Sequence, residues 1–107
     1  MNISKYKVSP TENAVHIQLA GQFTFHSRKA FNEAGLSALA HVGSRQIALD
    51  MADVDYLDSA ALGMLLLLRD KAALAGQQIV LLRPRGRVLQ ILQVANFERY
   101  FSFEQTF

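Results

Sequence analysis

One segment, residues 59–76, most constrains what this chain can fold into. It consists mainly of Ala, Leu and Met, which favour the α-helix, and it opens on Ser59, a residue suited to cap a helix start. Gly76 is suited to end the helix. Segment 45–50 is a predicted strand that ends in an acid, and an extended, partly polar segment at 52–57 leads from it to Ser59. Segment 78–83 is a near-continuous apolar run, typical of a central strand with parallel neighbours. This order predicts a βαβ unit, in which the helix crosses over between two parallel strands.

Three further strands are expected around this unit. Residues 14–20 alternate between apolar and polar side chains, which predicts a half-buried strand. We expect it to form a hairpin with an edge strand at 3–8, through a turn at 9–13. A last short strand is expected at 100–103.

Two further helices complete the prediction. Residues 27–41 have roughly helical spacing, with Ser27 as the cap at the start and 42–44 as the end. A short helix is expected at 88–94, and its inward residues are Leu89, Leu92 and Ala95. The predicted fold class is therefore α/β, a mixed sheet of about four to five strands with helices packed against it. The start of the 59–76 helix then lies at the carboxyl edge of a parallel strand, where open α/β sheets tend to place functional groups.

The apolar residues of the 59–76 helix occupy more than one face. Counting 100 degrees per residue, the face opposite Ser59 should pack on the sheet, and it carries Ala61, Leu65, Leu68 and Ala72. Within about 60 degrees of Ser59 lie Gly63, Leu66, Asp70 and Leu74. A glycine notch and a leucine beside a hydroxyl suit a docking surface for another protein. The alternative is that a second layer of the same domain covers Leu66, and the helix geometry leaves both interpretations open.

The composition indicates one domain, residues 1–107, without a metal or cofactor site. Of the 107 residues 50% are hydrophobic and 19% are charged, which is enough apolar material for a single core. Cysteine is absent, so disulfides and thiolate metal sites are excluded. His16, His26 and His41 have no ligand spacing, so we expect no metal.

The sequence favours a soluble, cytoplasmic location and a protein partner. The first residues lack the pattern of a signal peptide, and the longest apolar run, residues 64–68, is too short to cross a bilayer, so no membrane insertion is expected. The net charge is +2, with one basic cluster at Arg83, Arg85 and Arg87. Without interleaved aromatics or a known motif, this cluster is predicted to be a solvated loop and no nucleic acid is expected as a partner.

The carboxylates before the long helix do not predict an enzyme. Asp53, Asp55 and Asp58 with Ser59 suggest a nucleophile or a magnesium site at first sight. However, the segment contains no histidine or lysine to act as a base, and the chain has no Gly-rich phosphate loop. We therefore expect turn formation, capping and solubility from Asp53 and Asp55, and helix-dipole compensation or partner contact from Asp58.

The segment Asp58-Ser59-Ala60-Ala61-Leu62-Gly63 resembles the Asp-Ser-Ser-Gly-Leu-Gly signature of STAS domains, specifically the bacterial anti-sigma factor antagonists. The resemblance covers essentially the whole chain, including segments 21–23, 47–50 and 96–98. It implies that Ser59 is phosphorylated by an anti-sigma factor with a serine kinase fold and dephosphorylated by a PP2C-like phosphatase. It also implies a monomer or weak dimer.

The resemblance implies partner switching, in which the unphosphorylated chain binds the anti-sigma regulator and phosphorylation at Ser59 releases it. The residues expected to contact the partner are Asp58, Ala60, Gly63, Leu66, Thr24 and Phe25. Related systems use a response regulator with a phosphatase output, or target a diguanylate cyclase or motility regulator. The alternative is a STAS subunit of an ABC-type lipid transport complex, which would bind its ATPase permanently and which Ala60 fits.

The sequence departs from the family pattern at three positions. Ala60 replaces the second serine and Ala61 the glycine of the signature, so Ser59 is the one hydroxyl left in the motif. Thr24 stands where the family often has an aspartate, which removes a charge that could contact the kinase. The alternative for Thr24 is a hydrogen bond to a local backbone group.

Overall fold

The sheet of this protein is mixed, as the sequence predicts. The computed structural model describes residues 6–10, 14–41 and 45–105, and within them five strands form one sheet in the order β1-β2-β3-β4-β5. The elements in chain order are β1 (Tyr6–Pro10), β2 (Ala14–Phe23), the 3-10 turn η1 (Phe25–Ser27), α1 (Arg28–Leu39), β3 (Gln46–Leu57), α2 (Ser59–Leu74), β4 (Gln78–Leu82), α3 (Gly86–Val94), the 3-10 turn η2 (Phe97–Arg99) and β5 (Ser102–Glu104).

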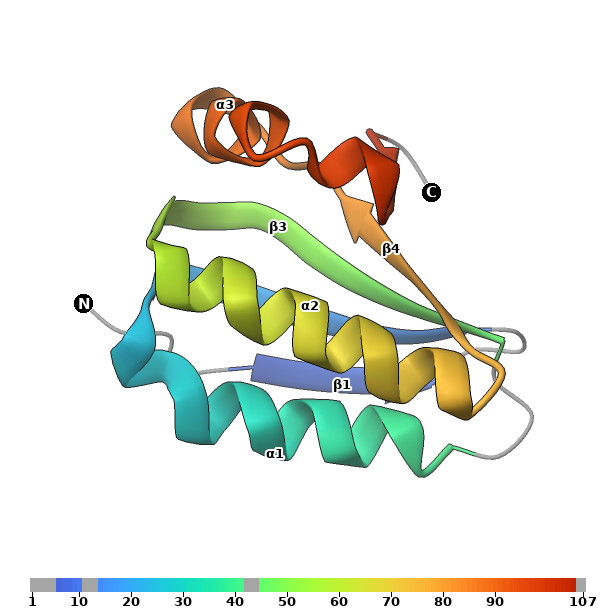
Figure 1. Cartoon of the computed structure of the whole chain (residues 1–107). Coiled ribbons are helices and arrows are strands. Elements are labelled where there is room, and N and C mark those ends of the chain that lie inside the picture. Colours follow the sequence, from blue (N-terminus) through green and yellow to red (C-terminus); the bar gives the residue numbers. More distant parts are fainter. Residues whose placement is uncertain (1–5, 11–13, 42–44, 106–107) are drawn as a thin grey trace.

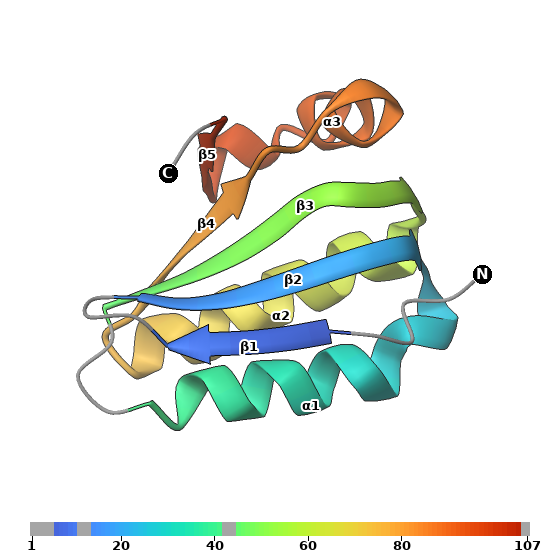
Figure 2. The ribbon, with the colours of Figure 1, turned by 180° about the vertical axis from the view of Figure 1, so that it is seen from behind.

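The predicted βαβ unit is present. β1 is antiparallel to β2, whereas β2, β3, β4 and β5 are parallel neighbours. Each parallel step is made through a helix, and α2 is the crossover between β3 and β4. α1 and α2 lie side by side on one face of the sheet, and α3 lies at the far side of β3 from them (Figure 1). From behind, the ribbons of β1, β2 and β3 have no described helix in front of them (Figure 2).

The core lies between the sheet and the α1–α2 layer. Its fully buried side chains include Ile17, Leu19, Ile47, Leu49 and Leu81 from the strands. The inward face predicted for α2 is confirmed, because Ala61, Leu65, Leu68 and Ala72 are all buried. α1 approaches α2 closely at Gly35, where a Cβ atom would meet Leu68 Cδ1 at 3.0 Å.

Two strands run further than the sequence pattern predicts. β2 continues to Phe23 instead of ending at residue 20, and β3 continues to Leu57, so the extended segment expected at 52–57 belongs to the same strand as 45–50. Two register shifts in the β2–β3 pairing allow Phe23 and Leu57 to become partners. The β3–β4 pairing ends at Asp50, so β4 does not cover the second half of β3. The residues of this half are partly polar and lack the continuous apolar pattern of a central strand. This extension carries both strands to the beginnings of η1 and α2.

The ends of the helices were predicted less well than their existence. Gly76 does end α2, with a φ of 72°, and Gln77 N donates to Ala72 O at 2.8 Å. In α3 the buried residues are Val88 and Leu92, whereas Leu89 and Ala95 are only partly buried. Ser27 is the N-cap residue of α1, as predicted, but its side chain makes no capping hydrogen bond to that helix.

The remaining predicted segments concern the ends and the turns. The last strand begins at Ser102 rather than at residue 100. Residues 3–5 of the predicted edge strand, residues 11–13 of the turn and residues 42–44 after α1 lie outside the described residues. None of the helices in the described part of the chain has the length and hydropathy that a bilayer crossing requires.

Candidate functional site

Asp58 fixes the start of α2 against the end of β2. Its backbone is extended, with φ −104° and ψ 179°, and its Oδ1 accepts a hydrogen bond from Ala61 N at 2.9 Å. Its Oδ2 accepts from Phe25 N at 3.2 Å, and its own backbone N donates to Phe23 O at 3.3 Å. Asp58 is therefore the N-cap of α2, and the prediction that Ser59 caps the helix is wrong. An aspartate and a serine are equally good caps, and the aspartate is the residue that also reaches Phe25.

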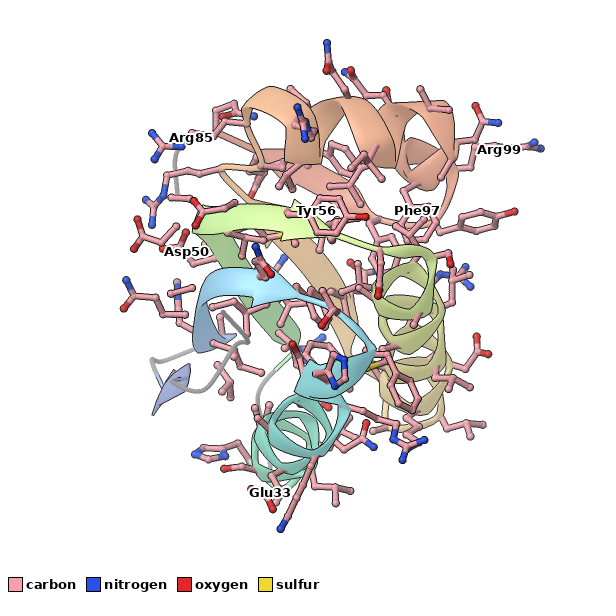
Figure 3. All side chains as sticks on the ribbon, turned by 90° about the vertical axis from the view of Figure 1, so that its left-hand side faces the viewer. Glu33, Asp50, Tyr56, Arg85, Phe97 and Arg99 are labelled. Carbon is pink, nitrogen blue, oxygen red and sulfur yellow. The ribbon has the colours of Figure 1, made fainter. Side chains whose placement is uncertain are left out.

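Ser59 is the first residue inside α2, and it is exposed. Its hydroxyl makes no hydrogen bond to any residue in the described ranges, because Asp58 supplies the cap. The positive end of the helix dipole lies at this position and favours an added negative charge, whereas the Asp58 carboxylate beside it opposes one. The Ser59 hydroxyl is therefore exposed, and within the described ranges no contact depends on it. Figure 3 looks onto this end of the molecule.

The turn η1 places Thr24 and Phe25 beside the start of α2. Thr24 Oγ1 accepts from His26 N at 3.2 Å, and Thr24 N donates to Ser27 Oγ at 3.1 Å, so the pair forms a capping box. Thr24 is half-buried, and the alternative of a local backbone hydrogen bond is the one that holds. Phe25 is 53% exposed, with the Arg28 guanidinium 4.8 Å from its ring centroid. Of the two, Phe25 is the more exposed residue.

Gly63 and Leu66 differ in exposure although they share a helix face. Gly63 is exposed, and a Cβ atom there would have nothing within 4 Å among the described residues. Leu66 is only half-exposed and packs against the core, so the domain itself covers part of it. Ala60 is also half-buried. The open surface beside Ser59 is therefore the notch at Gly63 more than the side chain of Leu66.

An apolar groove between α2 and α3 lies next to this surface, and it was not predicted from the sequence. The groove has a volume of about 310 Å³, and its lining residues are Leu62, Arg87, Gln90, Ile91, Val94 and Ala95. Leu62 lies one helical turn after Ser59, and Val94 is 84% exposed. The signal was present in the sequence, because α3 has more apolar residues than its inward face can bury. We call Ser59, Gly63 and this groove the α2–α3 face.

The carboxylates near the site serve structural contacts. Asp50 pairs with Arg83, Asp53 Oδ2 accepts from Gln18 Nε2 at 3.4 Å, and Asp58 is the cap described above. Among the described residues no group of three or more His, Cys, Asp or Glu side chains is placed to hold a metal ion. Figure 3 shows Tyr56, which is 39% exposed, on β3 below α3. It is a further exposed aromatic at this end that the sequence analysis did not select.

Two comparisons with known sequences place the chain in a family. The family model described as "Mlab, STAS domain" matches residues 7–103. A STAS-domain containing protein of Pseudomonas aeruginosa (strain UCBPP-PA14) is 40% identical over 86 residues, which cover 80% of this chain and 83% of that protein.

Solved structures with the same fold include two anti-sigma factor antagonists. A putative one from Thermotoga maritima has a TM-score of 0.83 at 19% identity, covering 94% of this chain and 86% of that chain. SpoIIAA in its unphosphorylated form has a TM-score of 0.70 at 14% identity, covering 96% and 89%. The phosphorylated form of this Bacillus cell fate determinant has a TM-score of 0.69 at 16% identity, covering 92% and 90%. At these identities the likeness establishes a shared fold.

Proposed function

This chain belongs to the STAS domain family, and we propose that it is an anti-sigma factor antagonist controlled by phosphorylation at Ser59. In its unmodified form it binds a regulator of the anti-sigma factor class with a serine kinase fold. Phosphorylation releases that regulator, and a PP2C-like phosphatase restores binding. The observation that carries this proposal is the exposed Ser59 hydroxyl, at the first residue of α2 and beside the α2–α3 face.

The fold supports a binding role over catalysis. Several of the similar structures are described as anti-sigma factor antagonists, one of them in a phosphorylated form, and another is a sulfate transporter family protein. Asp58, the acidic residue directly before Ser59, is engaged in capping α2 and in holding Phe25 N. This arrangement suits a Ser59 hydroxyl that accepts a phosphoryl group from another protein.

The negative charge of a phosphate on Ser59 provides the physical reason for release of the regulator. A phosphate adds about 1.5 to 2 negative charges, which the helix start tolerates as long as water surrounds them. When a partner covers the α2–α3 face, the same charges must be desolvated next to the Asp58 carboxylate. A loss of about 3 kcal/mol of binding free energy would weaken the complex by about two orders of magnitude. That change is sufficient to release a partner.

Apolar side chains of the regulator are expected to occupy the groove between α2 and α3, because its walls are almost entirely apolar. We predict that Val94→Asp weakens regulator binding about tenfold or more, since a charge would have to be buried in the interface. Stability should change by less than about 0.5 kcal/mol, because Val94 is 84% exposed. Titration calorimetry and urea unfolding measure the two effects. Leu74→Asp is the matched control, because Leu74 is 91% exposed but lies at the other end of α2. If both variants lowered the affinity for the regulator equally, the groove would not be part of the interface.

A substitution at Gly63 is expected to change the stability of the fold and the affinity for the regulator in opposite directions. Gly63→Ala should raise the unfolding free energy by about 0.5 to 1 kcal/mol, because alanine is the better helix former and its Cβ meets open space here. If the regulator packs against the notch, the same methyl group lowers its affinity. Urea unfolding and a binding titration of one variant test both statements. A gain in stability with unchanged affinity would place the interface away from Gly63.

An affinity pull-down from the native cells, followed by mass spectrometry, tests the proposed function. The baits are the wild type, Ser59→Ala and Ser59→Asp, and the wild-type bait is also examined for a phosphate on Ser59. We expect a serine kinase-type regulator and a PP2C-like phosphatase on the first two baits, and loss of the regulator from the third. Capture of the same ATPase by all three baits would instead support the ABC-type transport subunit.

A further inference from the structure

A narrow groove lies between α1 and α2, on the flank of α2 that is turned away from α3. Its volume is about 80 Å³. Its lining includes four exposed residues and, beneath them, two buried ones: Asn32, Leu36, Leu67 and Lys71, and then Gly35 and Leu68. We call it the α1–α2 groove. It has no residue in common with the α2–α3 face, and the proposed function makes no use of it.

Two leucines face each other across the α1–α2 groove and are largely exposed. Leu36 of α1 is 62% exposed, and Leu67 of α2 is 61% exposed. Leu74, seven residues after Leu67 and therefore on the same side of α2, is also exposed. The inward faces of the two helices are filled by other residues, among them Ala34 and Leu65. Exposed apolar side chains that gather on one surface are typical of a site for another protein.

The size of the groove favours a side chain of another protein over a small molecule. Small-molecule sites have volumes of about 300 to 1,000 Å³, several times the volume found here. α1 has 12 residues, and α2 runs beside it in the same direction (Figure 1), so the groove has a length of about 18 Å. A third helix of about three turns matches that length. Its apolar side chains can insert between those of the two helices, as in helix bundles.

Two cations lie along the groove. Lys71 lines it directly. Arg28 precedes two lining residues, Gly35 and Leu39, by seven and eleven positions, so it lies on their side of α1. The Arg28 guanidinium lies 4.8 Å from the ring centroid of Phe25, which holds it at the start of α1. No carboxylate in the described part of the chain forms an ion pair with either cation.

The carboxylates of α1 and α2 do not offset these two cations. Asp70 Oδ1 is 3.7 Å from Arg69 Nη1, so those two charges offset each other. Glu33 points away from α2 (Figure 3), and it follows Lys29 by four residues, a spacing at which opposite charges are neighbours. Lys71 is about 18 Å along α2 from its start, so the groove has one cation at each end. In a symmetric dimer of this face cation would meet cation, which disfavours a second copy as the occupant.

We propose that the α1–α2 groove binds an amphipathic helix of a second partner protein, and that this helix carries carboxylates at both ends of its apolar face. Its apolar side chains pack between Leu36 and Leu67. Its carboxylates pair with Arg28 at one end and with Lys71 at the other. The groove is separate from the α2–α3 face, so this partner binds whether or not Ser59 is phosphorylated.

The test is a titration of the full ¹⁵N-labelled chain with designed peptides, followed by NMR. The probe is a peptide of about 18 residues, long enough to form a helix, with leucine at every third or fourth position and glutamate in its first and last turns. A second peptide has lysine in place of each glutamate. We expect the acidic peptide to shift the backbone amides of Leu36, Leu67 and Lys71 with saturation, and to bind about tenfold more tightly than the lysine peptide. Equal affinities, or no saturable shift at these amides, would overturn the proposal.

Two variants separate the apolar contribution from the charge contribution. Leu67→Gln keeps a side chain of similar size without a charge, and it should weaken binding of the acidic peptide about tenfold because apolar burial is lost. Lys71→Glu should weaken the acidic peptide about fivefold and strengthen the lysine peptide. Val94→Gln, an equally exposed position on α3, should bind the acidic peptide like the wild type. Wild-type affinities in Leu67→Gln and Lys71→Glu, or an equal loss in Val94→Gln, would contradict the proposal.

The same spectra distinguish the other possible occupants. Shifts of Leu36 and Leu67 that grow with the concentration of the chain alone would assign the groove to a second copy and overturn the proposal. Shifts caused by vesicles of anionic phospholipid but not by the acidic peptide would assign it to a lipid surface and do the same. Ser59→Asp should bind the acidic peptide like the wild type, so this result and the test of the phosphorylation switch can fail independently.

Discussion

Ser59→Asp will bind the regulator about ten to a hundred times more weakly than the wild type, whereas Ser59→Ala will bind it with wild-type affinity. The physical reason is the position of Ser59, the exposed first residue of α2, directly after the Asp58 carboxylate. A second carboxylate there must be desolvated when the partner covers the α2–α3 face. Alanine adds no charge and removes a hydroxyl that makes no hydrogen bond within the described residues. Titration calorimetry with the captured regulator gives both affinities.

The matched control for this prediction is Ser37→Asp. Ser37 is an exposed serine on α1, so the change adds the same charge to the same protein away from the α2–α3 face. We expect it to alter the affinity by less than about threefold, the effect of a distant and screened charge. If Ser59→Asp and Ser59→Ala bound equally well, the charge switch would be wrong. If Ser37→Asp were as weak as Ser59→Asp, the effect would be one of net charge rather than position.

Asp58→Ala will lower the unfolding free energy by about 2 to 3 kcal/mol, which combines the loss of an N-cap with the loss of a hydrogen bond to a charged group. Asp58 Oδ1 caps α2 at Ala61 N, and Oδ2 holds Phe25 N at the start of η1. No other described side chain makes these two contacts. Urea unfolding measures the change.

Two further variants test whether this loss of stability comes from the two side-chain hydrogen bonds of Asp58. Asp58→Asn retains a capping oxygen but loses the acceptor for Phe25 N, so about 1 to 1.5 kcal/mol should be lost. Asp55→Ala removes an exposed carboxylate of the same segment and should change the stability by less than about 0.5 kcal/mol. An Asp58→Ala protein as stable as Asp55→Ala would show that Asp58 does not join α2 to the η1 turn.

The periodicity of the sequence was sufficient to predict the fold class and the crossover helix. The inward face of α2 followed from a 100-degree step because four small or apolar residues recur at that spacing and all are buried. Gly76 could be placed because a left-handed residue is needed where the helix ends. These features depend on local geometry, which the order of the residues determines.

The features that the sequence did not predict depend on contacts between distant segments. Asp58 takes the cap from Ser59 because its second oxygen reaches Phe25, 33 residues earlier in the chain. β2 extends to Phe23 and pairs there with Leu57 of β3, although the alternating pattern of β2 ends at residue 20. The groove at Val94 exists because Leu62 of α2 lies beside residues of α3, and no periodicity within either helix specifies that arrangement. The candidate site was therefore predicted in its position at Ser59 but not in its shape.

The central claim is that the phosphate on Ser59 decides whether the regulator stays bound. Its most direct test uses protein with phosphoserine incorporated at position 59, titrated with the regulator before and after treatment with a PP2C-type phosphatase. The account predicts a dissociation constant about a hundred times higher for the phosphorylated sample, and a return to the wild-type value once the phosphate is removed. The same dissociation constant before and after dephosphorylation would contradict it.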